Sequence, residues 1–556
     1  TWDMLRGIAG TGGLPWAVMG DFNEVLHASK HDGVGNHTRA QMEAFKDALD
    51  TCGLMDIGYS GLTWTFEKKV AGGSFTRVRL DRCVVNPEWS LAFPNSKLKH
   101  RTAAGSDHVP IEPIINDVHG ACRRGPRGFK YELMWERDQS LFDLVGTSWV
   151  ASEGDTVQAM QDKLHRVAGD LGNWDRQHFG SVRSEIQRLK KELETLRLLP
   201  SRTGPSHLET KILNRLVELY HREEILWRQR ARLEWLAHGD NNTYFFHLRA
   251  SRRRRKNQVK SLQRPDGHAT TDQTEMEEMT NEFYKTLYTS EGVQGMNLVL
   301  DTVPVKVTQA MIDLLNAPYR QEEIKTTLYQ MFPTKAPGPD GFPTHFFQRH
   351  WDVCREEITK VVVRIVDGTE STECINKTIL VLIPKVKNPT LLTQFRPISL
   401  CNVLYKIASK VISNRLKQVL PEIVSEEESA FVPGRLITDN IITAYECLHF
   451  MKRNKAKKHQ SCALKLDMMK AYDRVEWSYL RAIMLKLGFN ERWVDIMMNL
   501  VCSVQFSVMF NGKKLQEFQP SRGIRQGDPI SLYLFLLAAE GLSCLLKSRR
   551  ESSNLN

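Results

Sequence analysis

The chain has 556 residues, of which 41% are hydrophobic, and its 76 Lys and Arg against 65 Asp and Glu give a net charge of +11. This composition allows three or four domains with sizeable cores and favours a polyanionic partner. Ten cysteines without a CxxC pair or zinc spacing indicate reduced thiols in a nuclear or cytoplasmic protein. No run approaches 18 apolar residues and no leader opens the sequence, so we expect neither a membrane span nor secretion.

Residues 1–118 combine short β-like runs with one amphipathic helix. The runs "PWAVMGDFN", "GLTWTF" and "TRVRLDRCVV" are broken by glycines, which predicts strands joined by turns. A helix is predicted over "RAQMEAFKDALDTCG", because Met42, Phe45 and Leu49 fall on one side and Gly53 can stop it. This mixture indicates part of a layered α/β domain.

Residues 155–237 differ from the preceding part in composition and in the spacing of their apolar residues. Two long, charged segments of helical period flank "PSRTGPS", which predicts a helical hairpin that ends at Gly239. Five consecutive cations follow soon afterwards. Such a block is either a solvated tail or localisation signal, or a surface that contacts phosphates. The block consists of Arg252, Arg253, Arg254, Arg255 and Lys256.

The region from Tyr319 opens with a helix and a Pro/Gly-dense loop, "FPTKAPGPDGFPTHFF". Strands are predicted at "TILVLIPK" and "RPISL", and helices at "CNVLYKIASKVISNRLKQVL" and "IITAYECLHFMKRNK". The alternation in "CALKLD" predicts a strand that ends at Asp467, before a turn running into a helix. Downstream, Asp528 and Pro529 are predicted to cap and open an apolar helix.

The positions of Asp467 and Tyr472 suit a polymerase site. Polymerases hold two divalent metals with carboxylates on adjacent strand ends, and a ring five residues later can form the floor of a sugar pocket. The alternatives are a solvated surface acid and a core aromatic residue. Further candidates are two glycines that leave backbone open to a nucleotide and three cations that could hold a triphosphate: Gly523, Gly527, Lys385, Lys387 and Arg396.

Five blocks in a fixed order carry a family resemblance. "KAPGPDG", "LIPK…FRPISL", "NRL…SAFVPGR", "LKLDMMKAYDRVEW" and "GIRQGDPIS" resemble the reverse transcriptase of non-LTR (LINE-type) retrotransposons, the plant kind most closely. The resemblance covers roughly Tyr319 to the C-terminus. It implies the fingers and part of the palm of a right-hand polymerase, Mg²⁺ or Mn²⁺ as cofactor, and RNA template, target DNA and dNTPs as partners.

The resemblance also implies a role for each matching residue. Asp467 would be a catalytic metal ligand, with the carbonyl of Met468 as a second contact. Tyr472 would be the sugar gate that excludes a 2′-hydroxyl. The remaining binding residues would be Gln526 and Gly527 against template and incoming nucleotide, and Arg396 with Lys385 or Lys387 around the triphosphate.

Two departures from the family bear on activity. The family's next block is a hairpin carrying Tyr-x-Asp-Asp, which supplies the other metal-binding aspartates. The sequence reaches Asn556 without such a block, and Leu532 stands where the family usually has proline. Because one carboxylate cannot hold two metals, we expect a fragment whose polymerase site is incomplete as given.

Three short motifs near the N-terminus, "VMGDFNEVL", "RLDRCVV" and "GSDHVPI", resemble the C-terminal half of the endonuclease/exonuclease/phosphatase fold. By that resemblance His108 contacts the scissile phosphate, and Asp81 hydrogen-bonds its other nitrogen to fix the tautomer. Asp21, oriented by Asn23, would activate water or assist the leaving oxygen, and Asp107 would be a further metal or phosphate contact. The first half of that fold cannot be mapped, so we expect this domain neither to cut DNA nor to fold well alone.

We therefore expect an α/β and α+β multidomain chain in three parts. Residues 1–118 would form half of a two-layered-sheet nuclease, 119–318 a basic helical connector, and 319–556 the polymerase fingers and partial palm. The leading functional hypothesis is a fragment of a LINE-type reverse transcriptase with an endonuclease, which copies RNA from nicked target DNA. One alternative is a non-catalytic nucleic-acid-binding remnant. Another, a repair nuclease with an unrelated tail, is disfavoured by the polymerase blocks.

Overall fold

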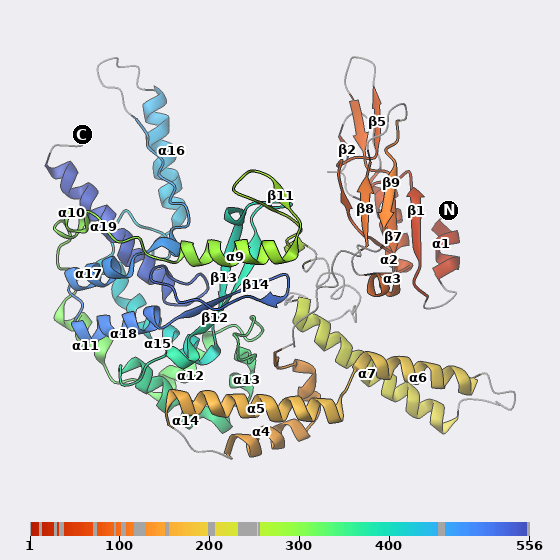
Figure 1. Cartoon of the computed structure of the whole chain (residues 1–556), viewed down its shortest axis with the longest axis horizontal. Helices are drawn as coiled ribbons and strands as arrows, with labels where there is room; N and C mark the ends of the chain where they lie inside the picture. Colours follow the sequence, from red (N-terminus) through yellow and green to blue (C-terminus); the bar gives the residue numbers. More distant parts are fainter. Residues whose placement is uncertain are drawn as a thin grey trace. The chain divides into compact units, whose positions relative to one another are not determined.

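The computed structural model describes residues 2–9, 14–26, 31–32, 38–69, 75–93, 96–101, 107–115, 128–150, 155–197, 206–231, 253, 256–453 and 462–552. Contacts divide the chain into two compact units. Unit 1 comprises Thr1–Arg124 with Trp235–Arg254, and unit 2 comprises Gly125–Glu234 with Arg255–Asn556. Each unit mixes helices and strands (Figure 1), so the expected mixed α/β class is confirmed.

Unit 1 is built from short strands and three helices among its described residues. Its elements are α1 (Trp2–Ala9), β1 (Ala17–Asp21), β2 (His31–Asp32), α2 (Arg39–Thr51), β3 (Met55–Asp56), β4 (Tyr59–Ser60), β5 (Phe66–Lys69), β6 (Phe75–Val78), β7 (Asp81–Val85), α3 (Pro87–Ala92), β8 (Lys97–His100) and β9 (Ile111–Ile114). They form three sheets in the orders β1-β7-β3, β2-β6-β5 and β4-β8-β9.

The helix α2 anchors one face of the first sheet. The Thr38 side chain accepts a hydrogen bond from the Gln41 backbone N–H, which starts the helix as a capping box. Phe45 and Leu49 are buried against Val84 of the central strand. The predicted helix is therefore confirmed. In the sheet that it covers, β1 pairs with β7, and the site residues of both strands lie at one end of the pair.

Unit 2 holds the remaining described elements. They are η2 (Leu133–Arg137), α4 (Ser140–Val150), α5 (Val157–His178), α6 (Val182–Arg197), α7 (His207–Ala231), β10 (Leu262–Gln263), β11 (Ala269–Thr270), α9 (Gln273–Leu287), α10 (Met296–Leu300), α11 (Gln309–Asn316), α12 (Gln321–Gln330), α13 (Thr344–Arg349), α14 (Trp351–Val366), η3 (Glu373–Ile375), β12 (Lys377–Pro384), η4 (Leu392–Gln394), β13 (Phe395–Leu400), α15 (Val403–Ile423), α16 (Ile437–Arg453), η5 (Tyr472–Arg474), α17 (Trp477–Leu487), α18 (Glu491–Cys502), β14 (Gln505–Phe510), β15 (Lys513–Lys514) and α19 (Ser531–Glu551).

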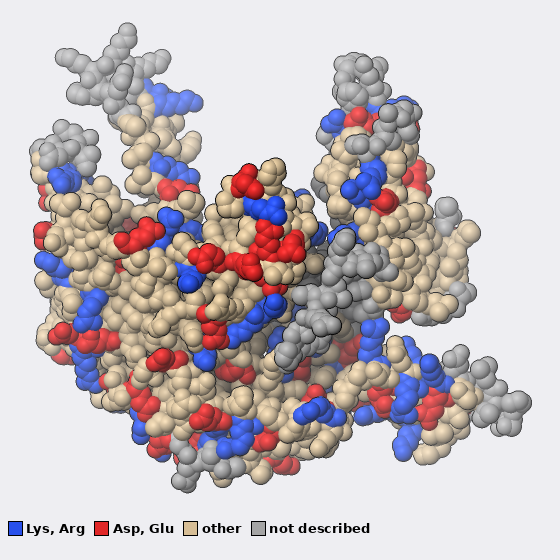
Figure 2. All heavy atoms as spheres, viewed as in Figure 1, with Lys and Arg blue, Asp and Glu red and all other residues tan. Residues whose placement is uncertain are grey.

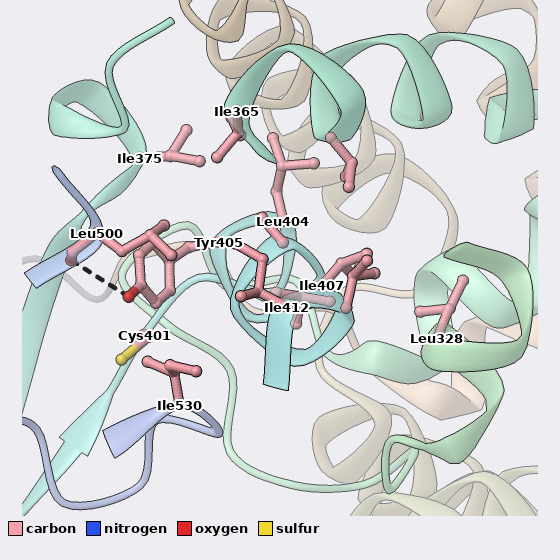
Figure 3. Packing of buried hydrophobic residues seen from close by; sticks show 14 of the residues in the cluster. Leu328, Ile365, Ile375, Cys401, Leu404, Tyr405, Ile407, Ile412, Leu500 and Ile530 are labelled. Carbon is pink, nitrogen blue, oxygen red and sulfur yellow. Dashed lines mark hydrogen bonds between the residues drawn. The ribbon is translucent and has the colours of Figure 1, made fainter. Parts of the chain in front are cut away.

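The helix α15 lies at the centre of the core of unit 2. Its apolar side chains Leu404, Ile407 and Ile412 are buried among residues of α12, α14 and α18 (Figure 3). Tyr405 joins this packing and donates a hydrogen bond of 3.3 Å to the Leu500 carbonyl. The predicted helix over residues 401–420 is confirmed. The neighbouring elements of unit 2 pack against it.

The sheet of unit 2 has the order β13-β12-β14-β15. β12 pairs antiparallel with β13, where Ile383 lies opposite Arg396, and parallel with β14, where Lys377 lies opposite Gln505. Both strands predicted in this part, over "TILVLIPK" and "RPISL", are present. β13 consequently presents its outer edge and the exposed Arg396 on the side away from β14.

The predicted strand that ends at Asp467 is wrong. Residues 462–468 are outside any strand and are exposed, with Leu464 and Leu466 exposed to 80% and 63%. Alternation of apolar and polar residues predicts a strand only if a neighbouring strand satisfies its backbone groups. No described strand pairs with this segment.

The preceding helix α16 is also uncovered. It has the bounds Ile437–Arg453, close to the prediction, yet none of its residues is buried. Six large apolar side chains on it are exposed to between 54% and 69%. This surface, called the α16 surface below, consists of Ile437, Ile441, Ile442, Tyr445, Leu448 and Phe450.

One described helix, α19, is long and apolar enough to cross a membrane by length and composition alone. The sequence had led us to expect no such segment. Several of its apolar residues, including Leu534 and Leu537, are buried in the core of unit 2. Core packing accounts for the composition of this helix.

Candidate functional site: a nucleotide pocket and a carboxylate–histidine cluster

The loop at Gln526 and Gly527 lies directly on strand β13. The backbone N–H of Ser399 donates a hydrogen bond of 2.8 Å to the Gln526 carbonyl. Gly527 has φ +118°, and a Cβ there would stand 3.0 Å from the Ser399 carbonyl oxygen, so a side chain is excluded by conformation and space. Gly527 is exposed and Gln526 partly so, which places both where a base or nucleotide can reach them.

Buried charges hold this loop from below. Arg525 donates to the Asp528 carboxylate at 2.7 Å, and its guanidinium lies 4.1 Å from the ring centroid of Tyr405. Asp528 also accepts hydrogen bonds from the Tyr405 hydroxyl, at 2.8 Å, and from Ser409. Asp528 was predicted as the cap of a helix. The helix starts later than predicted, because α19 begins at Ser531 with Ile530 at its N-cap. The buried carboxylate pairs with Arg525 and also accepts a hydrogen bond of 3.4 Å from the Ile530 backbone N–H in the turn before the helix.

Tyr472 lies beside the same loop. Its ring stacks on Phe535 of α19 with centroids 4.8 Å apart and an interplanar angle of 13°. Its carbonyl accepts a hydrogen bond of 2.8 Å from the Ile524 backbone N–H. The ring is half-buried, and burial raises the pKa of its phenol. Tyr472 is therefore fixed in place against both α19 and the loop that leads to Gln526.

Lys470 joins this segment to β13, and sequence reasoning missed it. Its backbone has φ +58°, and its buried ammonium donates to the Phe395 carbonyl at 3.3 Å and lies 4.0 Å from the Asp473 carboxylate. Burial lowers the pKa of Lys470, an effect that the charge of Asp473 partly offsets. Asp473 is itself buried and accepts a hydrogen bond of 2.8 Å from Tyr288. The signal in the sequence was a lysine between two candidate site residues.

Three cations were predicted to grip a triphosphate. All three are exposed: Lys385 and Lys387 lie in the loop directly after β12, and Arg396 lies on β13. The charge of Lys385 acts on both Lys470 and Asp473, so its ammonium lies near them. Lys385 thus lies near Lys470, whereas no contact of a described residue ties Arg396 or Lys387 to it.

The candidate metal ligand Asp467 is exposed, as is Met468 beside it. Among the described residues, no group of three or more His, Cys, Asp or Glu side chains could hold a metal ion. The acid closest in sequence, Asp473, is occupied by Tyr288 and Lys470. A single carboxylate does not make the ligand set of a two-metal site, so the donors described here do not fit that cofactor by themselves.

In unit 1, the ends of β1 and β7 bring three predicted residues together. Asp21 and Asp81 lie opposite each other in the antiparallel register. His108 Nδ1 lies 3.0 Å from Asp81 Oδ2, and its side chain is about one-third exposed. The expected hydrogen bond between Asp81 and His108 Nδ1 is present.

Electrostatics favour a protonated His108. Burial lowers its pKa, but the hydrogen bond to Asp81 and the charges of Asp21 and Asp107 outweigh burial, so the pKa is raised. The Asn23 backbone N–H donates to Asp21 Oδ1 at 2.8 Å in a turn with φ +52° at Asn23. Asn23 therefore contacts the Asp21 carboxylate through its backbone N–H, in keeping with the expectation that it orients Asp21.

The basic block is described only in part. Arg253 and Lys256 are exposed, and Arg252, Arg254 and Arg255 lie outside the described residues. The predicted helical hairpin is present as α6 and α7, and its predicted end at Gly239 also lies outside the described residues. How this block contacts a partner stays a prediction.

Comparison with known proteins places this geometry in context. Residues 383–555, which include Tyr472 and Gln526, match the family model described as reverse transcriptase (RNA-dependent DNA polymerase). The chain is 30% identical over 552 residues to an uncharacterized 149 kDa protein of transposon TX1 from Xenopus laevis, an alignment covering 96% of this chain and 41% of that protein.

A second relative is the Pol polyprotein of the type-2 retrotransposable element R2DM from Drosophila melanogaster. It is 26% identical over 220 residues, which is 39% of this chain and 20% of that protein. The chain spans less than half the length of either relative. The family description implies an RNA template, nucleotide substrates and a divalent metal for the family. On the match at residues 383–555 and these two relatives, the chain is similar to reverse transcriptases of non-LTR retrotransposons.

Proposed function

We propose that unit 2 binds the RNA template, the primer end and the incoming dNTP of an RNA-directed DNA polymerase primed at nicked target DNA. Tyr472 would exclude a 2′-hydroxyl, Gln526 and Gly527 would contact the base, and Lys385 with Arg396 would bind the triphosphate. Asp467 would contribute one carboxylate and Met468 its carbonyl to Mg²⁺, which would supply charge neutralisation for nucleotidyl transfer. Further acidic ligands would have to come from outside the described residues.

One observation carries the proposal. Three segments far apart in sequence meet: β13 through Ser399 and Phe395, the turn at Lys470 and Tyr472, and the loop at Gln526. They are joined by the Ser399–Gln526, Lys470–Phe395 and Tyr472–Ile524 hydrogen bonds of 2.8, 3.3 and 2.8 Å. A nucleotide needs cations, a planar contact and open backbone together, and these joined segments carry all three kinds of group.

Ternary-complex formation tests this proposal. A labelled DNA primer on an RNA template is bound to the full chain with Ca²⁺, and its dissociation is timed with a complementary or a mismatched dNTP. We expect the complementary dNTP alone to slow dissociation, and the effect to be lost in Arg396→Gln. Equal dissociation with both nucleotides would contradict the nucleotide pocket.

Primer extension with Mg²⁺ tests the metal site separately. We expect no extension by this chain, because the described donors are too few. Extension that is lost in Asp467→Ala would show that the site is complete and would overturn that part of the proposal. A chain that binds template but distinguishes no dNTP would instead fit the alternative of a nucleic-acid-binding remnant, located in the nucleus or cytoplasm.

A second function is favoured by the cluster in unit 1. We propose that Asp21, Asp81 and His108 form the phosphate-contacting part of a DNA endonuclease, with His108 Nε2 facing the scissile phosphate and Asp107 as an additional contact. The observation behind it is the Asp81–His108 hydrogen bond beside the facing Asp21. Nicking of supercoiled plasmid by the full chain, compared with His108→Ala, tests it. Equal nicking by both proteins would exclude this role.

A further inference from the structure

The central helix α15 reaches solvent along a single stripe. Fourteen of its 21 residues are buried. The others recur every three or four residues, so they share one side of the helix. They are Lys406, Lys410, Asn414, Lys417, Gln418, Pro421 and Glu422. The helix α15, which is otherwise buried, thus presents three lysines and two amide side chains to solvent. The acid of the stripe, Glu422, lies at the C-terminal end.

The lysines of this stripe form no ion pair with a described acid, although Lys406 lies near enough to Asp340 to act on its charge. None of Lys406, Lys410 and Lys417 has a carboxylate within 4.0 Å among the described residues. The cation of α15 that does form an ion pair is the buried Arg415, 2.8 Å from Glu323. Uncompensated cations held on a rigid helix are characteristic of a surface that meets an anion.

A fourth lysine is brought to the stripe by the Pro/Gly-dense loop. Gly338 packs so closely on the start of α15 that a Cβ would stand 2.3 Å from Asn402 Oδ1, and the Asp340 N–H donates to the same oxygen at 3.2 Å. Lys335 lies in this anchored loop and is exposed. Burial, and then the charges of Lys417 and Lys335, lower the pKa of Lys410, as expected for lysines that lie near one another.

Exposed aromatic rings belong to α12 and to the start of the loop that carries Lys335. Tyr329 and Phe332 are exposed to 53% and 42%. Tyr329 lines an open hollow of about 420 Å³ together with Lys325, Thr326 and Gln330. The Asn414 side chain of the stripe donates to Gln330 Oε1 at 3.0 Å, so the hollow and the stripe are neighbours.

We propose that this surface, called the α15 row and consisting of Lys335, Lys406, Lys410 and Lys417 with Tyr329 and Phe332, binds single-stranded RNA. The lysines contact phosphates and the rings stack on bases, the combination used by proteins that hold single strands. From Lys406 to Lys417 the helix rises about 16 Å, the length of about five stacked nucleotides. The choice of RNA over DNA rests on the proposed function.

Two other parts of the described surface do not offer this combination. Acidic residues gather over α9 in the view of Figure 2, and its exposed Glu278 and Glu282 would repel a polynucleotide. The α16 surface is apolar and carries no row of cations. A duplex would leave Tyr329 and Phe332 unused, because paired bases are not free to stack on a protein ring.

Salt-dependent binding tests the row without requiring catalysis. A labelled 12-nucleotide oligouridylate is titrated with the full chain at several salt concentrations, without dNTP or metal. We expect the triple variant Lys406→Gln/Lys410→Gln/Lys417→Gln to lower the slope of log affinity against log salt by about 2, and the affinity near 0.1 M salt about 10- to 100-fold. The matched control is Lys211→Gln/Lys285→Gln/Lys486→Gln, three exposed lysines elsewhere in unit 2.

Equal slopes for the two triple variants would overturn the proposal. The proposal would also be overturned if the triple variant lost affinity only for the matching DNA oligonucleotide, or lost as much affinity for duplex RNA as for single-stranded RNA. Photocrosslinking of 4-thiouridine RNA gives an independent readout, with Tyr329 or Phe332 expected in the crosslinked peptide and the crosslink lost in Tyr329→Ala/Phe332→Ala. If the protein fails the ternary-complex test yet shows this slope change, the α15 row is supported and the proposed nucleotide pocket is refuted.

Discussion

Arg525 and Asp528 are joined by a buried hydrogen bond of 2.7 Å that closes a four-residue loop upon itself. Both side chains are almost completely buried, at 3% and 6% exposure. The residues between them, Gln526 and Gly527, are consequently turned outward over β13. A charged pair inside the core thus determines which two residues reach the surface.

Breaking this pair should destabilise unit 2 strongly. We expect Arg525→Ala to lower the free energy of unfolding by about 3–5 kcal/mol, because it leaves the Asp528 charge buried without its partner. Urea unfolding followed by circular dichroism measures the change. The matched control is Lys547→Ala, whose ion pair with Glu427 at 3.1 Å is exposed, and which should cost less than about 1 kcal/mol. Similar costs for both variants would contradict the finding.

The raised pKa of His108 predicts a specific titration. In two-dimensional spectra of histidine-labelled protein, His108 should titrate above its ordinary value, and Asp81→Asn should lower that pKa. Because the folded-state pKa is raised, the contribution of the pair to stability is fully present below about pH 6.5 and is lost as the pH rises through the folded pKa. A titration unchanged by Asp81→Asn would show that the contact does not form in solution.

The Asp340 carboxyl group predicts a second pH dependence of stability, which arises from burial of the group. Burial raises the pKa of this carboxyl to about 7, although the Phe342 N–H and the charge of Lys406 lower it. The folded state therefore holds a proton that the unfolded state releases near pH 4. The free energy of unfolding should fall by up to about 4 kcal/mol as the pH rises from 4 to 7. Asp340→Asn should reduce the shift in urea midpoint between pH 4.5 and 7.5, and an identical shift would refute the raised pKa.

The α16 surface predicts dye binding. We expect the full chain to enhance the fluorescence of ANS, because contiguous exposed apolar side chains accept it. Ile441→Gln/Tyr445→Gln/Leu448→Gln should reduce the enhancement. Leu298→Gln/Val305→Gln/Leu546→Gln, which changes scattered exposed residues, should leave it nearly unchanged. Equal reductions in the two variants would mean that the α16 surface is covered in solution.

The spacing of apolar residues was sufficient to predict several helices and strands. The helix at Phe45 and Leu49 and the strands β12 and β13 follow directly from apolar spacing. The same reasoning was wrong for residues 462–467, because a strand needs a partner that the spacing does not supply. It also placed the start of α19 too early, because Asp-Pro before an apolar run resembles a helix cap even where the helix begins at Ser531 and Arg525 pairs with the carboxylate.

The candidate sites were predictable only where a motif fixed them. Asp81 and His108 were paired in advance from their motifs, and the structure brings them within 3.0 Å. Lys470 lies inside the "LKLDMMKAYDRVEW" block without a role that the block assigns to it, and the lysines of α15 belong to no motif. Their placement depends on which side of a helix or turn the core covers, and that is decided by tertiary packing, which a single sequence does not display.

The pairing of β12 also has a consequence for how the chain is made. Lys377 of β12 faces Gln505 of β14, 128 residues later, whereas the partner strand β13 follows almost at once. At 5–20 residues per second, a ribosome needs roughly 6–26 s between the two strands. During that interval the β12–β13 hairpin carries an unpaired, mostly apolar edge. Late closure of this sheet should make the nascent protein dependent on chaperones.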